Sequence, residues 1–247
     1  MALKVITFDF WNTIFDSSGG IERNSYRIIA IKEEFSRLGA DLKPENYQAA
    51  MKASWEYFNS IWKTEYRTPS ANETVRFFWD YLKVPYDEQA ISTVEAAFAE
   101  SVLHFPPKLV EGVEEVILSL REKYLLGIVS DTGFSPGTIL RQLLKDAGIY
   151  DSFQAFSFSD ETGVSKPHHK AFMTILEQLD CPPHSALHVG DIESTDIEGA
   201  IGIGMKAIRF SGDATRFLAN NAEPTTKANA EIFSWGEFAE VLEKINN

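Results

Sequence analysis

The hydrophobic pattern of this chain starts with a short apolar run over residues 3–8, Leu-Lys-Val-Ile-Thr-Phe. An apolar run with β-branched residues is typical of a strand that is buried on both faces of a parallel sheet. The run stops at Asp9, where the strand should leave the core. Ligands of open α/β sheets bind outside the carboxyl ends of the strands, so Asp9 stands where a catalytic group would be placed. The plainer alternative is that Asp9 only caps the turn predicted at Asn12 and Thr13.

Residues 21–103 change to a helical pattern. Apolar residues recur there at the three- and four-residue spacing of a helix face, and glycine or proline separates successive segments. Four of the five tryptophans lie between Trp11 and Trp79. This aromatic density indicates the core of a small helical bundle, although a share of it could line a pocket for an organic group. Four helices are predicted here. The first ends at Gly39, and the second runs from Pro44 toward Pro69. The third runs from about Asn72 to just before Pro85, and the fourth covers about 87–103.

From residue 106 to the end of the chain, strand and helix patterns alternate. Such alternation predicts right-handed crossovers and a parallel sheet with helices on both faces. The predicted fold class is therefore α/β: a doubly wound parallel sheet with a Rossmann-like core, formed by 1–16 and 106–247, and an α-helical domain inserted at 17–105. The predicted strands are 125–130, 153–158, 186–190 and 206–210, the helices are about 112–123, 136–147, 170–179 and 196–203, and a short strand and a closing helix follow from residue 231.

The net charge of −13 narrows the choice of partners, because 36 acidic residues outnumber 23 lysines and arginines. It argues against nucleic acid or an anionic membrane as the main partner, and an anionic substrate would need a local positive site. The single cysteine, Cys181, excludes an internal disulfide. No apolar stretch approaches the ~20 residues that span a bilayer, and Asp9 and Asp16 interrupt the early apolar run that a signal peptide would need. We therefore expect a cytoplasmic protein.

Several polar residues stand at or near the ends of the predicted strands. If the strands are neighbours, their carboxyl ends share one rim of the sheet and these side chains converge there. Carboxylates in one cleft repel each other unless a cation lies among them, and an oxygen-rich cluster suits Mg²⁺. A lysine and a hydroxyl beside such a site would hold a phosphoryl group, which a carboxylate can accept as an aspartyl-phosphate. The residues are Asp9, Ser130, Asp131, Lys166, Asp191 and Asp196.

With these residues the chain resembles the haloacid dehalogenase-like hydrolase superfamily over nearly its whole length. The four motifs of that family match D-F-W-N-T, I-V-S-D, S-K-P-H-H-K-A-F and G-D-I-E-S-T-D-I-E-G-A. By this resemblance Asp9 is the nucleophile, Ser130 hydrogen-bonds the transferring group, and Lys166 steadies both. Residues 17–105 look like the helical cap of the family, which closes over the active site.

The resemblance also implies a cofactor and a reaction. Mg²⁺ would be bound by Asp9, Asp191 and the backbone carbonyl of Trp11, with Asp196 supporting the metal site. The implied function is the Mg²⁺-dependent hydrolysis of small, anionic phosphorylated metabolites through an aspartyl-phosphate on Asp9. The side chains assigned to substrate binding are Trp11, Asn12, Thr13 and Asp131.

One position departs from the family pattern. Phosphatases of the family carry a second aspartate two residues after the nucleophile, which protonates the leaving oxygen and then activates water. In this chain that residue is Trp11. A backbone carbonyl does not depend on its side chain, so the metal site can survive. The general acid–base catalyst is absent from this position, and such a catalyst typically contributes about 10²–10⁴-fold in rate.

Three interpretations follow from this departure. The favoured one is a phosphatase whose substrate needs little protonation of the leaving group, or one that takes an acid from elsewhere. The second is a 2-haloacid dehalogenase, which also has an aromatic residue at this position and needs neither proton nor metal, although the intact Asp191 and Asp196 argue against it. The third is a non-catalytic relative that binds a ligand or partner. The aromatic helical surface could also form a homodimer contact. Residues that could supply chemistry near the rim are Glu22, Arg23, Arg27, His168 and His169.

Overall fold

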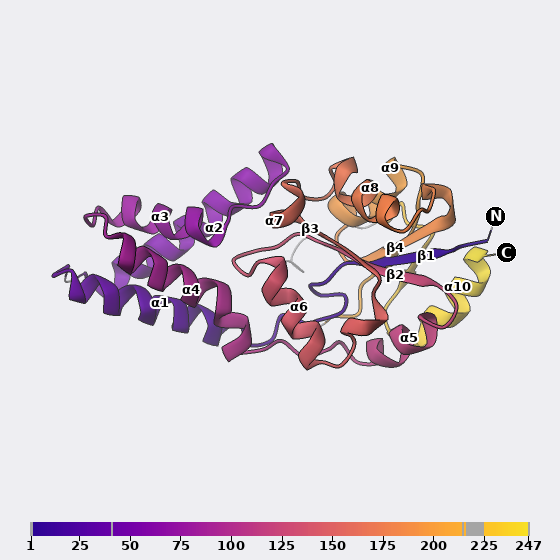
Figure 1. The fold of residues 1–247 in the computed structure, drawn as a ribbon, viewed down its shortest axis with the longest axis horizontal. Coiled ribbons are helices and arrows are strands. Elements are labelled where there is room, and N and C mark those ends of the chain that lie inside the picture. Colours follow the sequence, from indigo (N-terminus) through magenta and orange to yellow (C-terminus); the bar gives the residue numbers. More distant parts are fainter. Residues whose placement is uncertain (1, 41, 214, 216–224, 247) are drawn as a thin grey trace.

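The computed structural model describes residues 2–40, 42–213, 215 and 225–246. Its centre is a six-stranded parallel sheet in the order β3-β2-β1-β4-β5-β6 (Figure 1). The order runs outward from β1 in both directions, which confirms the predicted doubly wound, Rossmann-like fold class. The strands are β1 (Val5–Phe8), β2 (Leu125–Ser130), β3 (Ala155–Phe158), β4 (Ala186–Gly190), β5 (Lys206–Phe210) and β6 (Ala230–Ile232).

Different helices cover the two faces of the sheet. In β1, Ile6 and Phe8 belong to the apolar cluster formed with α5, α6 and α10, whereas Val5 belongs to the cluster formed with α8 and α9. Because both faces are buried, the central strands are apolar at nearly every position, as the sequence pattern indicated. The helices of this part are α5 (Val113–Leu120), α6 (Gly137–Asp146), α7 (Ser159–Thr162), α8 (His169–Gln178), α9 (Glu198–Gly202) and α10 (Phe238–Asn246).

Some element boundaries differ from the predicted ones. The strand predicted at 153–158 begins only at Ala155, because a short 3₁₀ turn precedes it. The helix predicted at 196–203 starts earlier, as a π-helical turn over Glu193–Ile197 that continues into α9. The glycine at the end of β4 permits this turn, since a Cβ atom at Gly190 would lie 2.4 Å from Cγ of Asp196. The wide turn thereby brings the Asp196 side chain against the end of β4.

Of the five described helices between β1 and β2, four lie side by side at the end of the molecule away from both termini (Figure 1). They pack around their own apolar cluster, which includes Phe35, Trp79 and Phe98. Phe134, from the loop after β2, is also part of this cluster and so joins the helices to the sheet. The helices are α1 (Gly20–Arg37), α2 (Pro44–Glu65), α3 (Ala71–Leu82) and α4 (Glu88–His104).

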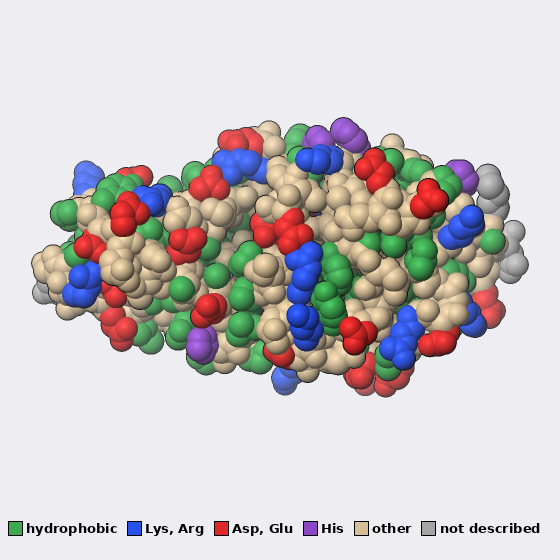
Figure 2. Space-filling view, in the orientation of Figure 1, with side chains coloured by type: hydrophobic (Ala, Val, Ile, Leu, Met, Phe, Trp, Pro, Cys, Tyr) green, Lys and Arg blue, Asp and Glu red, His purple; other side chains and the backbone are tan. Residues whose placement is uncertain are grey.

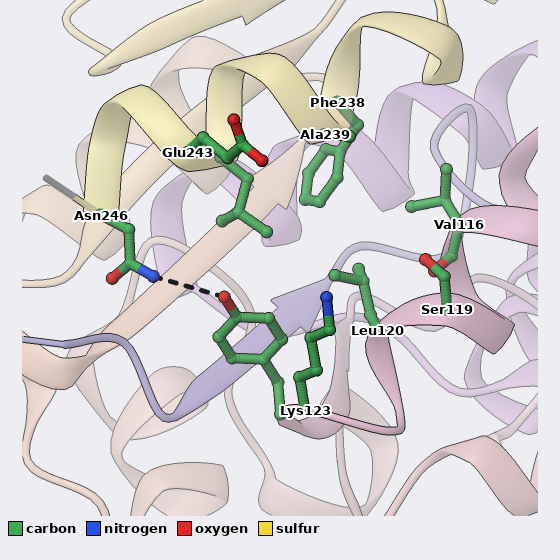
Figure 3. Close-up of a pocket in the computed structure, with 10 residues that line it drawn as sticks. Val116, Ser119, Leu120, Lys123, Phe238, Ala239, Glu243 and Asn246 are labelled. Atoms are coloured by element: carbon green, nitrogen blue, oxygen red, sulfur yellow. Dashed lines mark hydrogen bonds between the residues drawn. The ribbon is translucent and has the colours of Figure 1, made fainter.

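A small pocket of about 160 Å³ lies between α5 and α10, close to the chain termini (Figure 3). Asn246 closes one side of it, with its Nδ2 donating to the Tyr124 hydroxyl at 3.3 Å. The Oδ1 atom of the same side chain accepts from the backbone N–H of Leu3 at 3.0 Å. This contact ties the last helix to the residues just before β1, at the end of the sheet opposite to Asp9.

The outer surface carries both signs of charge. On the face shown in Figure 2, lysine and arginine side chains lie in small groups among aspartates and glutamates. Among the described residues, no helix combines the length and the apolar character needed to cross a membrane. For a chain with a net charge of −13, the positive charge that an anionic substrate requires has to be local.

Candidate active site

The groups predicted at the strand ends lie together at the carboxyl end of the sheet. β1 pairs in parallel with both β2 and β4, and the backbone N–H of Asp9 donates to the carbonyl of Val189 at 2.8 Å. Asp9 therefore lies between Ser130, the last residue of β2, and Asp191, which directly follows β4. All three side chains are buried. Three neighbouring parallel strands thus deliver three polar groups to one point.

Lys166 connects two of the buried carboxylates. It lies in the loop between α7 and α8, and its Nζ donates to Asp9 Oδ1 at 2.5 Å and to Asp196 Oδ1 at 2.6 Å. Burial alone would lower the pKa of Lys166, but the charges of Asp196, Asp9 and Asp131 outweigh it and raise this pKa. The amine is therefore charged and fixed in position beside the predicted nucleophile.

Three buried carboxylates lie close together here, and two of them contact Lys166. One carboxylate oxygen from each of Asp9, Asp191 and Asp196 lies within 4.8 Å of those of the other two. Burial raises the pKa of Asp9, and the charges of Asp196 and Asp191 raise it further against the opposing charge of Lys166. A divalent cation among these groups would offset their repulsion, and Mg²⁺ prefers carboxylate oxygens as ligands. The donor set therefore fits Mg²⁺.

Asp196 is held by four hydrogen bonds. Its Oδ1 accepts from Lys166 Nζ and from His188 Nε2, the latter at 3.1 Å. Its Oδ2 accepts from the backbone N–H of Ile192 at 3.0 Å and from Thr195 Oγ1 at 3.4 Å. Burial would raise the pKa of Asp196, but the charge of Lys166 and the hydrogen bonds outweigh it and hold this pKa well below its usual range. Asp196 is thus suited to positioning Lys166 and the loop after β4.

His188 supports this arrangement from inside the sheet, and sequence reasoning missed it. Burial lowers its pKa, so the ring is neutral and can donate from Nε2 to Asp196. Its Nδ1 lies 2.9 Å from Thr7 Oγ1, which donates in that tautomer. In the sequence, the clue to both residues is that each is a polar side chain within an otherwise apolar strand. Thr7 and His188 are paired neighbours on β1 and β4.

Replacement of Asp196 by asparagine is expected to lower the free energy of unfolding by about 3–5 kcal/mol at pH 7. One of its oxygens would become an NH₂ group facing N–H and O–H donors, and a buried charge pair would be lost. Because the pKa of Asp196 is lowered in the folded state, its stabilising effect is complete above its ordinary pKa near ~4 and is lost as the pH falls through the folded value.

Urea unfolding measures this effect, with Asp151→Asn as the control because Asp151 is exposed and lies outside the site. The difference between the wild type and Asp196→Asn should shrink as the pH is lowered below ~4. Equal midpoints at pH 7 for the wild type and Asp196→Asn would contradict the assigned network.

A cavity of about 630 Å³ opens from these carboxylates toward the helices α1 and α2. Of the side chains predicted to bind substrate, Trp11, Asn12 and Asp131 line it. Thr13 does not. Its side chain is completely buried in the turn after β1, and its carbonyl accepts a hydrogen bond from Trp235 Nε1 at 3.2 Å. Its position therefore does not support the assignment of Thr13 to substrate binding.

The Ser130 hydroxyl is completely buried at the end of β2, and its Oγ has no hydrogen-bond partner among the described residues. The hydroxyls of Thr13 and Ser152 are likewise buried without a described partner, so it is the position of Ser130 at the end of β2, beside Asp9, that bears on its role. This environment is compatible with the predicted contact between Ser130 and a transferring group.

Asp131 links the cavity to α2. Its Oδ2 accepts from Trp62 Nε1 at 2.8 Å, and its Oδ1 accepts from the backbone N–H of Lys166 at 2.9 Å. Burial raises the pKa of Asp131 to about 6, against the opposing effects of Lys166 and of both hydrogen bonds. The side chain is therefore oriented by donors from the sheet loop and from the helical part of the chain.

The cationic and acidic candidates from the sequence separate into two groups. Glu22, Arg23 and Arg27 line the cavity. His168 and His169 are not among its lining residues; their rings stack on each other at the start of α8, where His168 Nδ1 accepts from the backbone.

Arg23 binds the two chain segments that connect the sheet to the helices α1–α4. Its guanidinium donates to the carbonyls of Ser17, Ser18 and Phe105, at 3.4, 2.7 and 2.9 Å respectively. Ser17 and Ser18 precede α1 and Phe105 follows α4, so one side chain holds both crossings.

Comparison with known proteins places these features in a family. A family model described as haloacid dehalogenase-like hydrolase matches residues 3–204. The chain is 29% identical over 214 residues to a glyceraldehyde 3-phosphate phosphatase of Pyrococcus abyssi, which covers 84% of this chain and 81% of the relative.

Solved structures show the same fold. A 2-haloacid dehalogenase of Pseudomonas syringae pv. Tomato superposes with a TM-score of 0.73 at 21% identity, covering 98% of this chain and 99% of that one. A phosphatase of Thermococcus onnurineus superposes with a TM-score of 0.67 at 23% identity, covering 97% and 98% of the two chains. At this level of identity the likeness establishes architecture and leaves the reaction to be argued from the site.

Proposed function

Because this chain belongs to the haloacid dehalogenase-like hydrolase family, we propose that it is an Mg²⁺-dependent phosphatase of small phosphorylated metabolites. The observation that carries this proposal is the position of Lys166 Nζ, 2.5 Å from Asp9 and 2.6 Å from Asp196 at the base of the cavity. Transfer of a phosphoryl group to an aspartate requires a carboxylate nucleophile, a fixed positive charge and a metal-binding acidic cluster, and this site has candidates for each.

In the proposed reaction, an Asp9 carboxylate oxygen attacks phosphorus and the bond from phosphorus to the substrate oxygen breaks. This gives an aspartyl-phosphate and an alkoxide or phenoxide, which takes a proton from solvent to become the alcohol or phenol. Water then attacks the phosphorus, which releases inorganic phosphate and restores the carboxylate. Lys166 neutralises charge on the phosphoryl oxygens, and the Ser130 hydroxyl donates a hydrogen bond to one of them.

Asp9, Asp191 and the backbone carbonyl of Trp11 are the proposed Mg²⁺ ligands, and Asp196 supports them through Lys166 and the loop after β4. When bound, the ion supplies charge compensation for the phosphoryl oxygens beside Asp9. We treat α1–α4 as a cap whose inner surface closes the cavity, with core residues 1–16 and 106–247 and cap residues 17–105.

Trp11 narrows the choice of substrate. Its ring lines the cavity and packs edge-on against Phe10, with ring centroids 5.0 Å apart. An indole cannot protonate the leaving oxygen, so esters of acidic alcohols or phenols should react best unless another group supplies the proton. Glyceraldehyde 3-phosphate, named in the Pyrococcus relative, belongs in the first set of substrates to test.

Phosphate release is expected from p-nitrophenyl phosphate and from members of a panel of phosphorylated metabolites in the presence of Mg²⁺. EDTA should abolish this release and excess Mg²⁺ should restore it, because the acidic cluster would otherwise repel the phosphoryl group. A colorimetric phosphate assay provides the measurement. Phosphate release that persists unchanged in EDTA would contradict a metal-dependent reaction.

One observation favours a second candidate, a 2-haloacid dehalogenase, because the aromatic Trp11 occupies the acid position and departure of a halide needs no proton. The buried cluster of Asp9, Asp191 and Asp196 counts against it, since that reaction requires no metal. Incubation with 2-chloropropionate in EDTA separates the two candidates. Chloride release there would establish the dehalogenase, and no turnover in either assay would favour a non-catalytic, ligand-binding relative.

A further inference from the structure

Arg27 on α1 gives the cavity a second cationic group in addition to Lys166. It lines the cavity, but only 6% of its surface is exposed. The guanidinium has five N–H donors, and the structure shows one hydrogen bond from them, from Nη1 to Asn24 Oδ1 at 3.0 Å. Its buried Nε has no partner among the described residues. Arg27 is therefore a buried cation with most of its donors unused.

The other buried cations of the described residues each lie beside oxygen acceptors, although the Nε of Arg209 also lacks a hydrogen bond. Lys166 contacts two carboxylates, and Arg209 lies 3.6 and 3.7 Å from Glu193 and Glu231. Arg23 donates to three backbone carbonyls. In the described part of the chain, Arg27 has no carboxylate within 4.0 Å. Because an unpaired buried charge is costly, its position requires an explanation.

Aromatic rings hold the guanidinium in place. Its central carbon lies 4.7 Å from the ring centroid of Phe134 and 5.6 Å from that of Phe98. These contacts orient the planar group, but they supply no hydrogen-bond acceptor for its N–H donors. Burial, followed by the charge of Arg23, lowers the pKa of Arg27 to about 9, so the group is still mostly charged at neutral pH. The result is a preoriented fork of donors beside the cavity.

The cavity between the two cations is lined by large rings. Trp11, Trp55, Phe58 and Trp62 line it together with the carboxylates at its base. Its volume of about 630 Å³ exceeds what a single phosphoryl group fills and leaves space for a carbon skeleton. A molecule with a phosphoryl group at Asp9 can therefore extend along these rings toward α1.

We propose that Arg27 binds a second anionic group of the substrate, so that the preferred substrates are phosphate monoesters that also carry a carboxylate or a second phosphate. The inference rests on the proposed phosphatase function and names the substrate class for that site. Bidentate hydrogen bonds from arginine match carboxylates and phosphates equally well, and only the test distinguishes these two anions.

Two matched pairs of substrates test the inference: 3-phosphoglycerate against glyceraldehyde 3-phosphate, and fructose 1,6-bisphosphate against fructose 6-phosphate. The first pair supplies a carboxylate and the second pair a second phosphate. In the wild type, kcat/KM should be about 10- to 100-fold higher for the doubly anionic member of at least one pair. In Arg27→Gln this preference should disappear, mainly through a higher KM, because the contact forms in the bound state before reaction.

Arg37→Gln is the matched control, since Arg37 lies on the same helix, is exposed and is bound to Glu34 and Asp87 outside the cavity. It should retain the wild-type preference. The inference would be overturned if Arg27→Gln lowered kcat/KM equally for both members of a pair. It would also be overturned if the wild type preferred the singly anionic members.

Two further measurements keep the inference testable if turnover is absent or the variant is unstable. Calorimetry on catalytically inactive protein measures binding alone. The dissociation constant of 3-phosphoglycerate should be about 10- to 100-fold lower for the single variant Asp9→Asn than for the double variant Asp9→Asn, Arg27→Gln. Equal dissociation constants would overturn the second anion site, whereas loss of turnover with retained discrimination would overturn only the phosphatase function. Arg27→Met should melt at or above the wild-type temperature without ligand, because it removes an unpaired buried charge. A clear fall in this temperature would show that Arg27 has a structural role instead.

Discussion

Phosphate release should fall by at least about 10⁴-fold when Asp9 is replaced by asparagine, because the amide cannot attack phosphorus. The substitution keeps the size and shape of the side chain at the end of β1. It also leaves Lys166 bound to Asp196, so the base of the cavity should keep its organisation. Initial rates with Mg²⁺ and p-nitrophenyl phosphate, compared at saturating substrate, measure the change.

Asp151→Asn is the matched control for this variant, since Asp151 is an exposed aspartate outside the site and its replacement should leave the rate unchanged. Residual activity of Asp9→Asn within tenfold of the wild type would contradict the assignment of Asp9 as nucleophile. Trapping adds an independent check. With the wild type, acid quenching during turnover should retain phosphate covalently bound to the protein, and with Asp9→Asn it should not.

Replacing Trp11 by aspartate should raise kcat for unactivated alkyl phosphates by about 10²-fold or more, because it restores a carboxyl group at the acid–base position. The gain should be much smaller for p-nitrophenyl phosphate, whose leaving group needs little protonation. The two esters are compared in the same assay, so the ratio of the gains is the result that matters.

The matched control is Trp11→Asn, which also removes the indole but supplies no acid. It should give no selective gain on alkyl phosphates. If Trp11→Asp accelerates both esters equally, or if Trp11→Asn gives the same gain, then relief of crowding by the indole explains the change, and a missing acid does not limit the rate. The expected pH profile of Trp11→Asp should also show a new acidic group that the asparagine variant lacks.

The position of the catalytic rim could be predicted from the sequence because it follows from topology. Asp9, Ser130 and Asp191 each stand at the end of an apolar run, and parallel neighbouring strands bring such ends together without any knowledge of side-chain packing. The helices between residues 20 and 104 also follow from periodicity and from their proline and glycine boundaries. Local patterns are sufficient for both results.

Other features depend on packing that periodicity does not encode. The partners of Asp196 come from a π-helical turn, a strand histidine and the loop of Lys166. Phe134 belongs to a core loop, but its side chain lies in the apolar cluster of the helices. The sequence marks Arg27 as one of several cationic residues near the rim, yet only its surroundings show that no carboxylate of the described residues pairs with it. These relations join segments far apart in the chain, so a single sequence cannot reveal them.

The contacts of Arg23 join the two chain crossings to each other. Its guanidinium holds carbonyls of Ser17, Ser18 and Phe105, on both chain crossings between the sheet and α1–α4. The two crossings are therefore held together at one point by a single guanidinium group. Trp62, which donates to Asp131, and Arg27, which lines the cavity, both lie on the helices that these crossings join to the sheet. One side chain outside the acidic cluster thereby supports the placement of both walls of the cavity.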